Sequence, residues 1–322
     1  MKHKLRFTLV LLVLTVAIGP FFVPFSTSGT LSEREALKNV LGMSDTYLTS
    51  LNHRIHFESE GDENADSVII LLHGFGASSF SFEHVIEDLA KDSFVIAYDR
   101  AAFGFTERPL AWQDVNPYSF DGQLIVLDDV VSTFGKNKEI TLIGHSAGAS
   151  LALEYSIRNP LRVKNLVLVA PAISGDGAYP GWIRPLFSIP QVRHLGPILV
   201  STIATSGLQI LYDSYFDQSK ITKATLNGYT APLQVKNWER AFWEFVTAPR
   251  GEPAPIEELK ARTLIVTGDN DVIVPTQVSI QNAAKVKNVA ELIVMKDTGH
   301  LPHEENPDDF VKHILEFLKG DS

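Results

Sequence analysis

The chain has 322 residues, of which 45% are hydrophobic and 20% charged, a composition typical of globular proteins. This excludes intrinsic disorder and collagen-like structure, and the length suits one large domain or two. The absence of cysteine excludes disulfides, thiol nucleophiles and thiolate metal ligands. The net charge of −10 argues against a broad nucleic-acid-binding surface, so we expect no nucleic-acid partner.

The first thirty residues combine a basic tip with an apolar run. Lys2, Lys4 and Arg6 precede Phe7–Phe25, which contains no charged residue. As a helix, the 19 residues of this run would extend roughly 28 Å, close to the hydrocarbon thickness of a bilayer. We therefore predict that residues 1–30 contain a hydrophobic helix that anchors the protein in a membrane.

A cleavable signal peptide is an alternative interpretation of the same segment. Ser26 and Ser28 are small residues that follow the apolar run, and Pro20 could end the helix near Ile18. A buried core helix is the third alternative, although the run lacks amphipathic periodicity. Both export hypotheses place the rest of the chain outside the cytoplasm, either membrane-anchored or, if the segment is cleaved, secreted.

Beyond a polar connector at residues 31–50, where Ser32 is a plausible helix cap, short apolar runs alternate with helical patterns. Strands are predicted at Arg54–Glu58, Val68–Leu72, Phe94–Tyr98, Ile140–Ile143, Asn165–Val169, Thr263–Thr267 and Glu291–Val294. Helices are predicted at Phe82–Ala90, Phe120–Phe134, Ala147–Arg158 and Pro307–Leu318. Several strands are continuous apolar runs, as expected when both faces are covered. The pattern predicts an α/β fold with a mostly parallel central sheet flanked by helices.

One long stretch interrupts this alternation. Residues 172–258 separate two predicted strands and are far longer than a normal crossover. The stretch is rich in proline at both ends and contains three of the four tryptophans, Trp182, Trp238 and Trp243. We interpret it as an inserted helical lid, or alternatively as a structural subdomain with its own aromatic core. Residues 51–171 and 259–322 would then form the α/β core.

The strongest local motif is the glycine-bracketed serine of Gly144–Gly148, which follows a short apolar strand and precedes a helical pattern. A G-x-S-x-G turn between a strand and a helix presents its serine at the edge of a sheet. The glycines are required because side chains at their positions would collide in so tight a turn. Ser146 is therefore a candidate nucleophile.

A serine hydroxyl needs a base to activate it, and the base needs a carboxylate to orient it. After the insertion, a buried strand ends in a turn that carries Asp269 and Asp271. The last predicted strand is followed by a glycine turn and His300. Serine, acid and histidine thus follow one another in the chain order of the α/β hydrolases.

Residues 53–319 resemble the α/β-hydrolase superfamily, in its lidded esterase and lipase branch. Five motifs carry the resemblance, in the order that the family has: His73–Gly76, Asp99–Gly104, Gly144–Gly148, Gly268–Asp271 and Gly299–His300. Together they are specific for the fold and for a catalytic triad. They are not specific for a substrate.

The resemblance implies a role for each matching residue. Ser146 corresponds to the nucleophile, His300 to the general base and Asp271 to the acid, with Asp269 as its rival. The positions of Phe75 and Ala147 correspond to the two backbone N–H groups of the oxyanion hole. These assignments complete a Ser–His–Asp site that needs no cofactor.

The remaining histidines near these motifs are expected to be structural. His73 belongs to the turn after a strand, and His145 should point away from the reaction. His303 lacks the preceding glycine that marks the base. We find no histidine and acid spacing typical of a metal site and no phosphate-binding glycine loop.

We predict a serine hydrolase that cleaves small-molecule carboxylic esters with an apolar group through an acyl-enzyme. The alternatives within the superfamily are a carbon–carbon bond hydrolase, whose elbow usually has asparagine where His145 stands, and a cofactor-free haloperoxidase. Epoxide hydrolases and dehalogenases need an aspartate where this chain has Ser146. A non-catalytic binder of small ligands and a membrane-tethered interaction protein are the alternatives outside enzymology.

Overall fold

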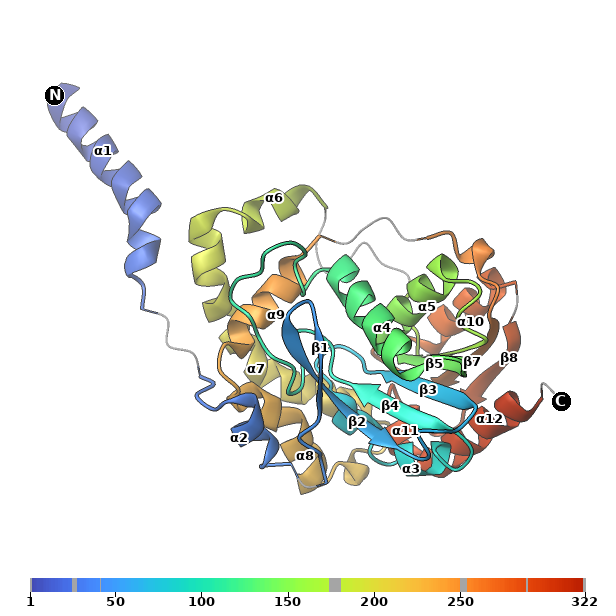
Figure 1. Cartoon of the computed structure of the whole chain (residues 1–322). Coiled ribbons are helices and arrows are strands. Elements are labelled where there is room, and N and C mark those ends of the chain that lie inside the picture. The colour runs from blue at the N-terminus through green and yellow to red at the C-terminus, as the bar shows by residue number, and fades with distance from the viewer. Residues whose placement is uncertain are drawn as a thin grey trace.

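The structure is a computed structural model that describes residues 2–24, 28–40, 42–173, 181–249, 254–287 and 289–320. At its centre is an eight-stranded sheet with the strand order β1-β2-β4-β3-β5-β6-β7-β8 (Figure 1). The strands are β1 (Tyr47–Ser50), β2 (His53–Glu60), β3 (Ser67–Leu72), β4 (Phe94–Tyr98), β5 (Glu139–His145), β6 (Asn165–Val169), β7 (Arg262–Gly268) and β8 (Val289–Met295). In this sheet β2 runs antiparallel to both of its neighbours, β1 and β4, and the pairs from β4 to β8 are all parallel. The predicted mostly parallel sheet is confirmed.

The parallel strands are apolar throughout because helices cover both faces of the sheet. In β3, Val68, Ile70 and Leu72 belong to one buried cluster, whereas Ile69 and Leu71 belong to another. Successive side chains of a strand point to opposite faces, so a continuous apolar run fills two cores at once.

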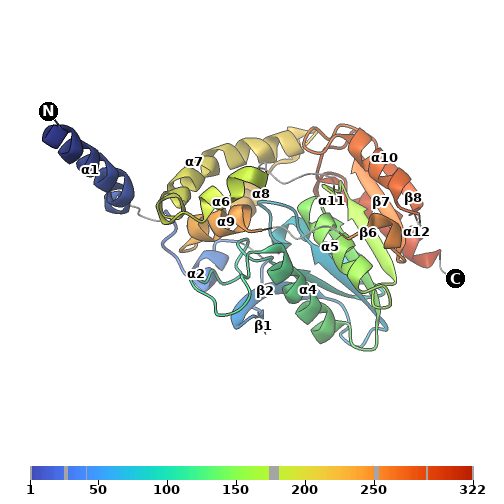
Figure 2. The same ribbon diagram turned by 90° about the horizontal axis from the view of Figure 1, so that it is seen from above.

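The helices form a layer on each face of the sheet (Figures 1 and 2). One layer contains α4 (Phe120–Phe134), α5 (Ala147–Arg158) and α10 (Thr276–Lys285); the other contains α3 (Ile86–Leu89) and α12 (Pro307–Lys319). The sequence predicts α4 and α5 with their observed bounds. It misses α10, and the helix predicted over Phe82–Ala90 is instead a 3-10 turn followed by the short α3.

The insertion between β6 and β7 is helical where the structure describes it. It contains α6 (Arg184–Phe187), α7 (Pro190–Ser214), α8 (Lys223–Thr230) and α9 (Trp238–Thr247), and it lies beside one edge of the α/β core (Figure 2). Two further short helices are α2 (Glu33–Leu37), capped by Ser32 as predicted, and α11 (Pro302–Glu305). Short 3-10 turns lie at Gly19–Phe22, Ser79–Phe82, Gly181–Ile183, Gln218–Lys220, Ala231–Gln234 and Ile256–Glu258.

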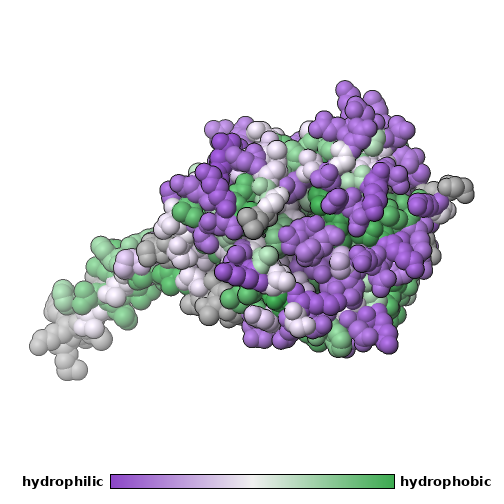
Figure 3. Space-filling model, turned by 90° about the horizontal axis from the view of Figure 1, so that it is seen from below, coloured by the Kyte–Doolittle hydropathy of each residue, from purple (hydrophilic) through white to green (hydrophobic). Residues whose placement is uncertain are grey.

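The N-terminal helix α1 (Lys2–Ile18) extends away from the body, and apolar residues cover much of its surface (Figures 1 and 3). It ends early because Pro20 has no backbone N–H to continue the helical hydrogen bonds. Its 17 residues reach roughly 26 Å.

The predicted membrane-spanning anchor is not supported. Across the described ranges, no helix combines the length and the apolar character needed to cross a bilayer. Ser26, named above for its small side chain near a cleavage site, lies outside the described residues. Export of the chain stays a prediction.

A buried carboxylate joins three segments at the carboxyl end of β4. Asp99 is fully buried, and its Oδ1 accepts a hydrogen bond from the N–H of Ser79 at 2.6 Å. Its Oδ2 accepts one from the N–H of Phe105 at 2.7 Å and lies 2.8 Å from Nδ1 of His56. Burial alone would raise the pKa of Asp99, but His56 holds it down at about 2. Burial would likewise lower the pKa of His56, which Asp99 raises to about 10.

Replacing this carboxylate should destabilise the protein in a pH-dependent way. We expect Asp99→Ala to lower the free energy of unfolding by about 3–5 kcal/mol, because it removes one of the two carboxylates beside the buried imidazolium, the other being Glu58, and leaves the N–H groups of Ser79 and Phe105 without their acceptor. The loss should be fullest between about pH 4 and 6.5, where both groups are charged in the folded and unfolded states. It should shrink as the pH rises from 6.5 towards 10 and His56 loses its proton.

Urea denaturation of both proteins over a pH series measures this difference. Asp66→Ala, at an exposed position just before β3, is the matched control. A loss that stays constant from pH 5 to pH 9 would contradict the ion pair.

Candidate active site

Ser146 lies in the sharp turn between β5 and α5. Its backbone has φ 51° and ψ −114°, a conformation that costs a non-glycine residue energy and that recurs at functional sites. A Cβ on Gly144 would lie 2.6 Å from Cα of Ala149, and one on Gly148 would lie 2.3 Å from the carbonyl oxygen of Leu72. Both glycines are therefore required by close packing of the turn.

His300 and Asp271 come together at the same edge of the sheet. Nδ1 of His300 lies 2.8 Å from Oδ2 of Asp271, and both residues are buried. The other oxygen of Asp271 accepts hydrogen bonds from the N–H groups of Ile273 at 2.9 Å and Val274 at 2.8 Å. These contacts fix the carboxylate against the imidazole and leave Nε2 of His300 for a proton transfer.

Asp269, the rival acid, has other partners. It is exposed, and its Oδ1 accepts hydrogen bonds from the side-chain amide of Asn270 at 2.7 Å and from the N–H of Thr298 at 3.2 Å. It thus closes the turns after β7 and β8. Of the two aspartates, Asp271 is the one beside the imidazole.

The two residues named for an oxyanion hole come from different elements, and of the two Phe75 lines the cavity that also contains Ser146. Phe75 follows β3 and is half-exposed, and Ala147 is the first residue of α5. The first N–H groups of a helix have no acceptor within the helix and attract negative charge. The arrangement can therefore support an anion beside Ser146.

The neighbouring histidines are buried and neutral. Nε2 of His145 lies 2.9 Å from the carbonyl oxygen of His300, and burial holds the pKa of His145 well below its usual range. Burial also lowers the pKa of His303 to about 3, where the ring stacks on Phe82. Burial and the nearby Arg100 lower that of His73 to about 4. In the described parts of the chain, no group of His, Asp and Glu could hold a metal ion.

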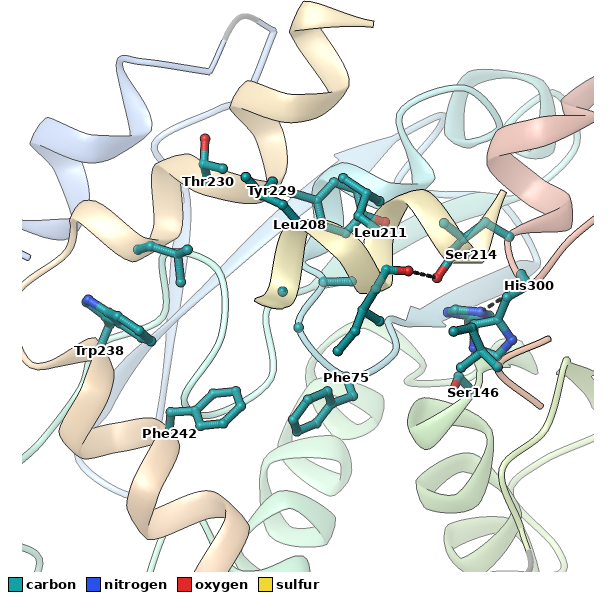
Figure 4. A pocket seen from close by; sticks show the side chains of 18 of the residues that line it. Phe75, Ser146, Leu208, Leu211, Ser214, Tyr229, Thr230, Trp238, Phe242 and His300 are labelled. Carbon is teal, nitrogen blue, oxygen red and sulfur yellow. Dashed lines mark hydrogen bonds between the residues drawn. The ribbon is translucent and has the colours of Figure 1, made fainter. Parts of the chain in front are cut away.

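An apolar cavity of about 180 Å³ opens beside Ser146 and His300 (Figure 4). The insertion and the core both contribute to its wall. The apolar lining comes from Phe75, Val200, Leu208, Ile210, Leu211, Leu233, Trp238, Phe242, Ile273 and Leu301. The cavity suits an apolar group of a small molecule.

Sequence reasoning missed the contacts that hold the histidine loop. The N–H of His300 donates a hydrogen bond to the carbonyl oxygen of Ser214, the last residue of α7, at 2.7 Å. The carboxylate of Glu305 accepts hydrogen bonds from the N–H groups of Gly299 at 2.7 Å, Phe216 at 3.2 Å and Asp217 at 2.6 Å. One buried side chain therefore binds the histidine loop to the end of the insertion.

The residue before it strengthens the same junction. Glu304 accepts a hydrogen bond from the hydroxyl of Tyr215 at 2.6 Å and another from the hydroxyl of Tyr229. Burial raises the pKa of Glu304 to about 7. The only sign of this junction in the sequence is the position of the two glutamates, close after His300.

Comparisons with known proteins agree with this architecture. The family model described as the alpha/beta hydrolase fold matches residues 67–307. The chain is 26% identical over 270 residues to an uncharacterized hydrolase, YugF, of Bacillus subtilis, covering 82% of this chain and 93% of that protein. It is 24% identical over 303 residues to Lipase 1 of Psychrobacter immobilis, covering 93% and 91%.

A relative of different chemistry matches equally well. The chain is 27% identical over 263 residues to the 2-hydroxy-6-oxo-6-(2'-aminophenyl)hexa-2,4-dienoic acid hydrolase of Metapseudomonas resinovorans, covering 78% of this chain and 83% of that protein. Among solved structures, a bacterial membrane phospholipase A is similar with a TM-score of 0.64 and 21% identity, over 99% of both chains. That likeness concerns the fold alone.

The carboxylate of Glu305 should matter to the reactivity of Ser146. Glu305→Gln places an amide N–H₂ against at least one of three N–H donors, which displaces the loop that holds His300. We expect the rate at which a fluorophosphonate labels Ser146 to fall by about 10- to 100-fold, because small misplacements of a catalytic group are costly. The rate is measured by quenching the labelling reaction at successive times and determining the labelled fraction by mass spectrometry.

The control is Lys220→Ala, since Lys220 contacts the backbone carbonyl of Glu305 at 2.6 Å and not its carboxylate. An unchanged labelling rate in a Glu305→Gln protein of normal thermal stability would refute the positioning role.

Proposed function

The chain belongs to the α/β-hydrolase fold family, and we propose that it is a serine hydrolase that cleaves carboxylic esters bearing an apolar group. One observation carries the proposal. Ser146 and His300 line the same apolar cavity, and Asp271 is hydrogen-bonded to Nδ1 of His300. This is the constellation that nucleophilic acyl transfer needs.

The reaction follows from these positions in two steps. Nε2 of His300 accepts the proton of Ser146 as Oγ attacks the ester carbonyl carbon, and Asp271 stabilises the imidazolium that forms. The tetrahedral oxyanion is stabilised by the N–H groups of Phe75 and Ala147, each worth about 10²–10³-fold in rate. The alcohol leaves with the proton from His300. Water, deprotonated by His300, then attacks the acyl-enzyme. The bond to Oγ of Ser146 breaks, His300 returns the proton to Oγ, and the acid is released.

The nature of the cavity supports an ester with an apolar group. Six of the ten apolar side chains named above as its lining come from α7 and α9. Burying each methylene of a substrate there contributes about 0.8 kcal/mol. The 24% identity to Lipase 1 over 93% of this chain supports the same class of substrate. We propose that the helical insertion, residues 172–258, acts as the lid over this cavity.

Hydrolysis of a carbon–carbon bond is the second candidate, favoured by the relative that acts on a dienoic acid. Such an acid carries a carboxylate. Among the described residues that line the cavity, none is lysine or arginine. An uncharged ester therefore fits the wall better than a dienoate.

Loss of the proposed nucleophile should abolish covalent chemistry. We expect Ser146→Ala to abolish labelling by a fluorophosphonate and to lower the turnover of p-nitrophenyl esters by about 10⁴-fold or more, with normal thermal unfolding. Mass spectrometry and absorbance assays measure the two effects. Labelling that persists in Ser146→Ala would overturn the assignment.

The two aspartates provide a matched pair of variants. Asp271→Asn should lower kcat by about 10²–10⁴-fold, because the imidazole loses its tautomer control and its counter-charge. Asp269→Asn removes the same charge from the same turn and should change kcat little. Equal losses in the two variants would contradict the assignment of Asp271.

Substrate class can be tested directly. Neutral p-nitrophenyl esters should be hydrolysed with a kcat/KM that rises with the size of the apolar group until the cavity is full. A 2-hydroxy-6-oxo-dienoate should be cleaved more slowly by at least tenfold in kcat/KM. Faster cleavage of the dienoate would instead support carbon–carbon bond hydrolysis over ester hydrolysis.

A further inference from the structure

Trp238, the first residue of α9, lines the cavity on the side away from Ser146 (Figure 4). Phe75 and Phe242 lie between this tryptophan and the catalytic residues in the same view. Trp238 is 4% exposed, and it packs in a cluster with Val200. A linear group that enters beside Ser146 therefore meets the indole last.

The indole is held from behind by the segment that follows α1. Nε1 of Trp238 donates a hydrogen bond to Oγ of Ser28 at 2.9 Å. Ser28 donates two hydrogen bonds of its own to Oε1 of Glu239, from Oγ at 2.7 Å and from its backbone N–H at 2.6 Å. Glu239 is fully buried. The three residues form a chain of hydrogen bonds that fixes the plane of the indole.

The next residues press the segment against the insertion. A Cβ on Gly29 would lie 2.0 Å from the carbonyl oxygen of Val235 and 3.0 Å from Cδ1 of Trp238. Leu31 donates a hydrogen bond to the carbonyl of Gln234 at 2.9 Å and accepts one from the N–H of Lys236 at 2.8 Å. Residues 28–31 are thus a rigid backing that leaves the indole no room to retreat.

We propose that Trp238, held by Ser28 and Glu239, determines the longest apolar group that the cavity accepts. The inference rests on the proposed ester hydrolysis and names the residue that limits its substrates. The indole of Trp238 lines the cavity and is held by hydrogen bonds on its other side, so a longer substrate cannot push it aside. The extra methylenes of such a substrate therefore stay in water.

The test is the ratio of kcat/KM for long-chain to short-chain p-nitrophenyl esters, from acetate to palmitate. Trp238→Ala should move the optimum to longer chains, and each methylene newly buried should raise kcat/KM by about fourfold. Ser28→Ala keeps the ring but removes its hydrogen-bond acceptor, and it should shift the optimum in the same direction by less.

Trp243→Ala is the matched control. This tryptophan lies on the same helix and in the same aromatic cluster, but it packs on Gly196 and does not line the cavity. The Trp243→Ala variant should keep the chain-length profile of the wild type. Trp238→Phe, a milder change, gives a smaller shift in the same direction and serves if the alanine variant does not fold.

The outcomes separate the two proposals. Ester turnover by the wild type, with the same chain-length profile in folded Trp238 variants, would overturn this inference alone. Absence of turnover with every ester in the wild type would overturn the proposed function and the inference with it. A shift seen equally in the Trp243 variant would also overturn the role of Trp238.

Discussion

The position of the candidate active site depends on the parallel pairing of the strands. Parallel strands bring their carboxyl ends to one edge of the sheet, where open α/β sheets bind their ligands. Leu72 of β3 pairs with Gly144 of β5, and Gly268 of β7 pairs with Met295 of β8. The residues that follow these four strands therefore converge from segments that are far apart in sequence. The candidate catalytic groups are Phe75, Ser146, Asp271 and His300.

The insertion does more than cover this edge, because it also carries part of the support of the histidine. The last carbonyl of α7 and the carboxylate of Glu305 are shared between the insertion and the loop of His300. A movement of this end of α7 would change the position of the imidazole. The position of the imidazole thus depends on this end of α7, whereas Trp238, at the far end of the cavity, is held by Ser28.

The sequence predicts what depends on local pattern. The buried strands, the Ser146 turn and helices α4 and α5 follow from periodicity and glycine spacing, and hydropathy gives the apolar character of α1. The full apolar run overestimates the length of the helix, which ends at Ile18, where Pro20 is expected to stop it. Contacts such as Ser28 with Glu239, or Glu305 with Asp217, are invisible in sequence, since they arise only when distant backbones meet.

The backing of the indole also has a consequence for the order in which the molecule assembles. Ser28 and its acceptor Glu239 are 211 residues apart in the chain. At a synthesis rate of about 5–20 residues per second, the segment waits roughly 10–40 s before its partner exists. The far wall of the cavity, where Trp238 is bonded to Ser28, is completed only after the insertion has been made.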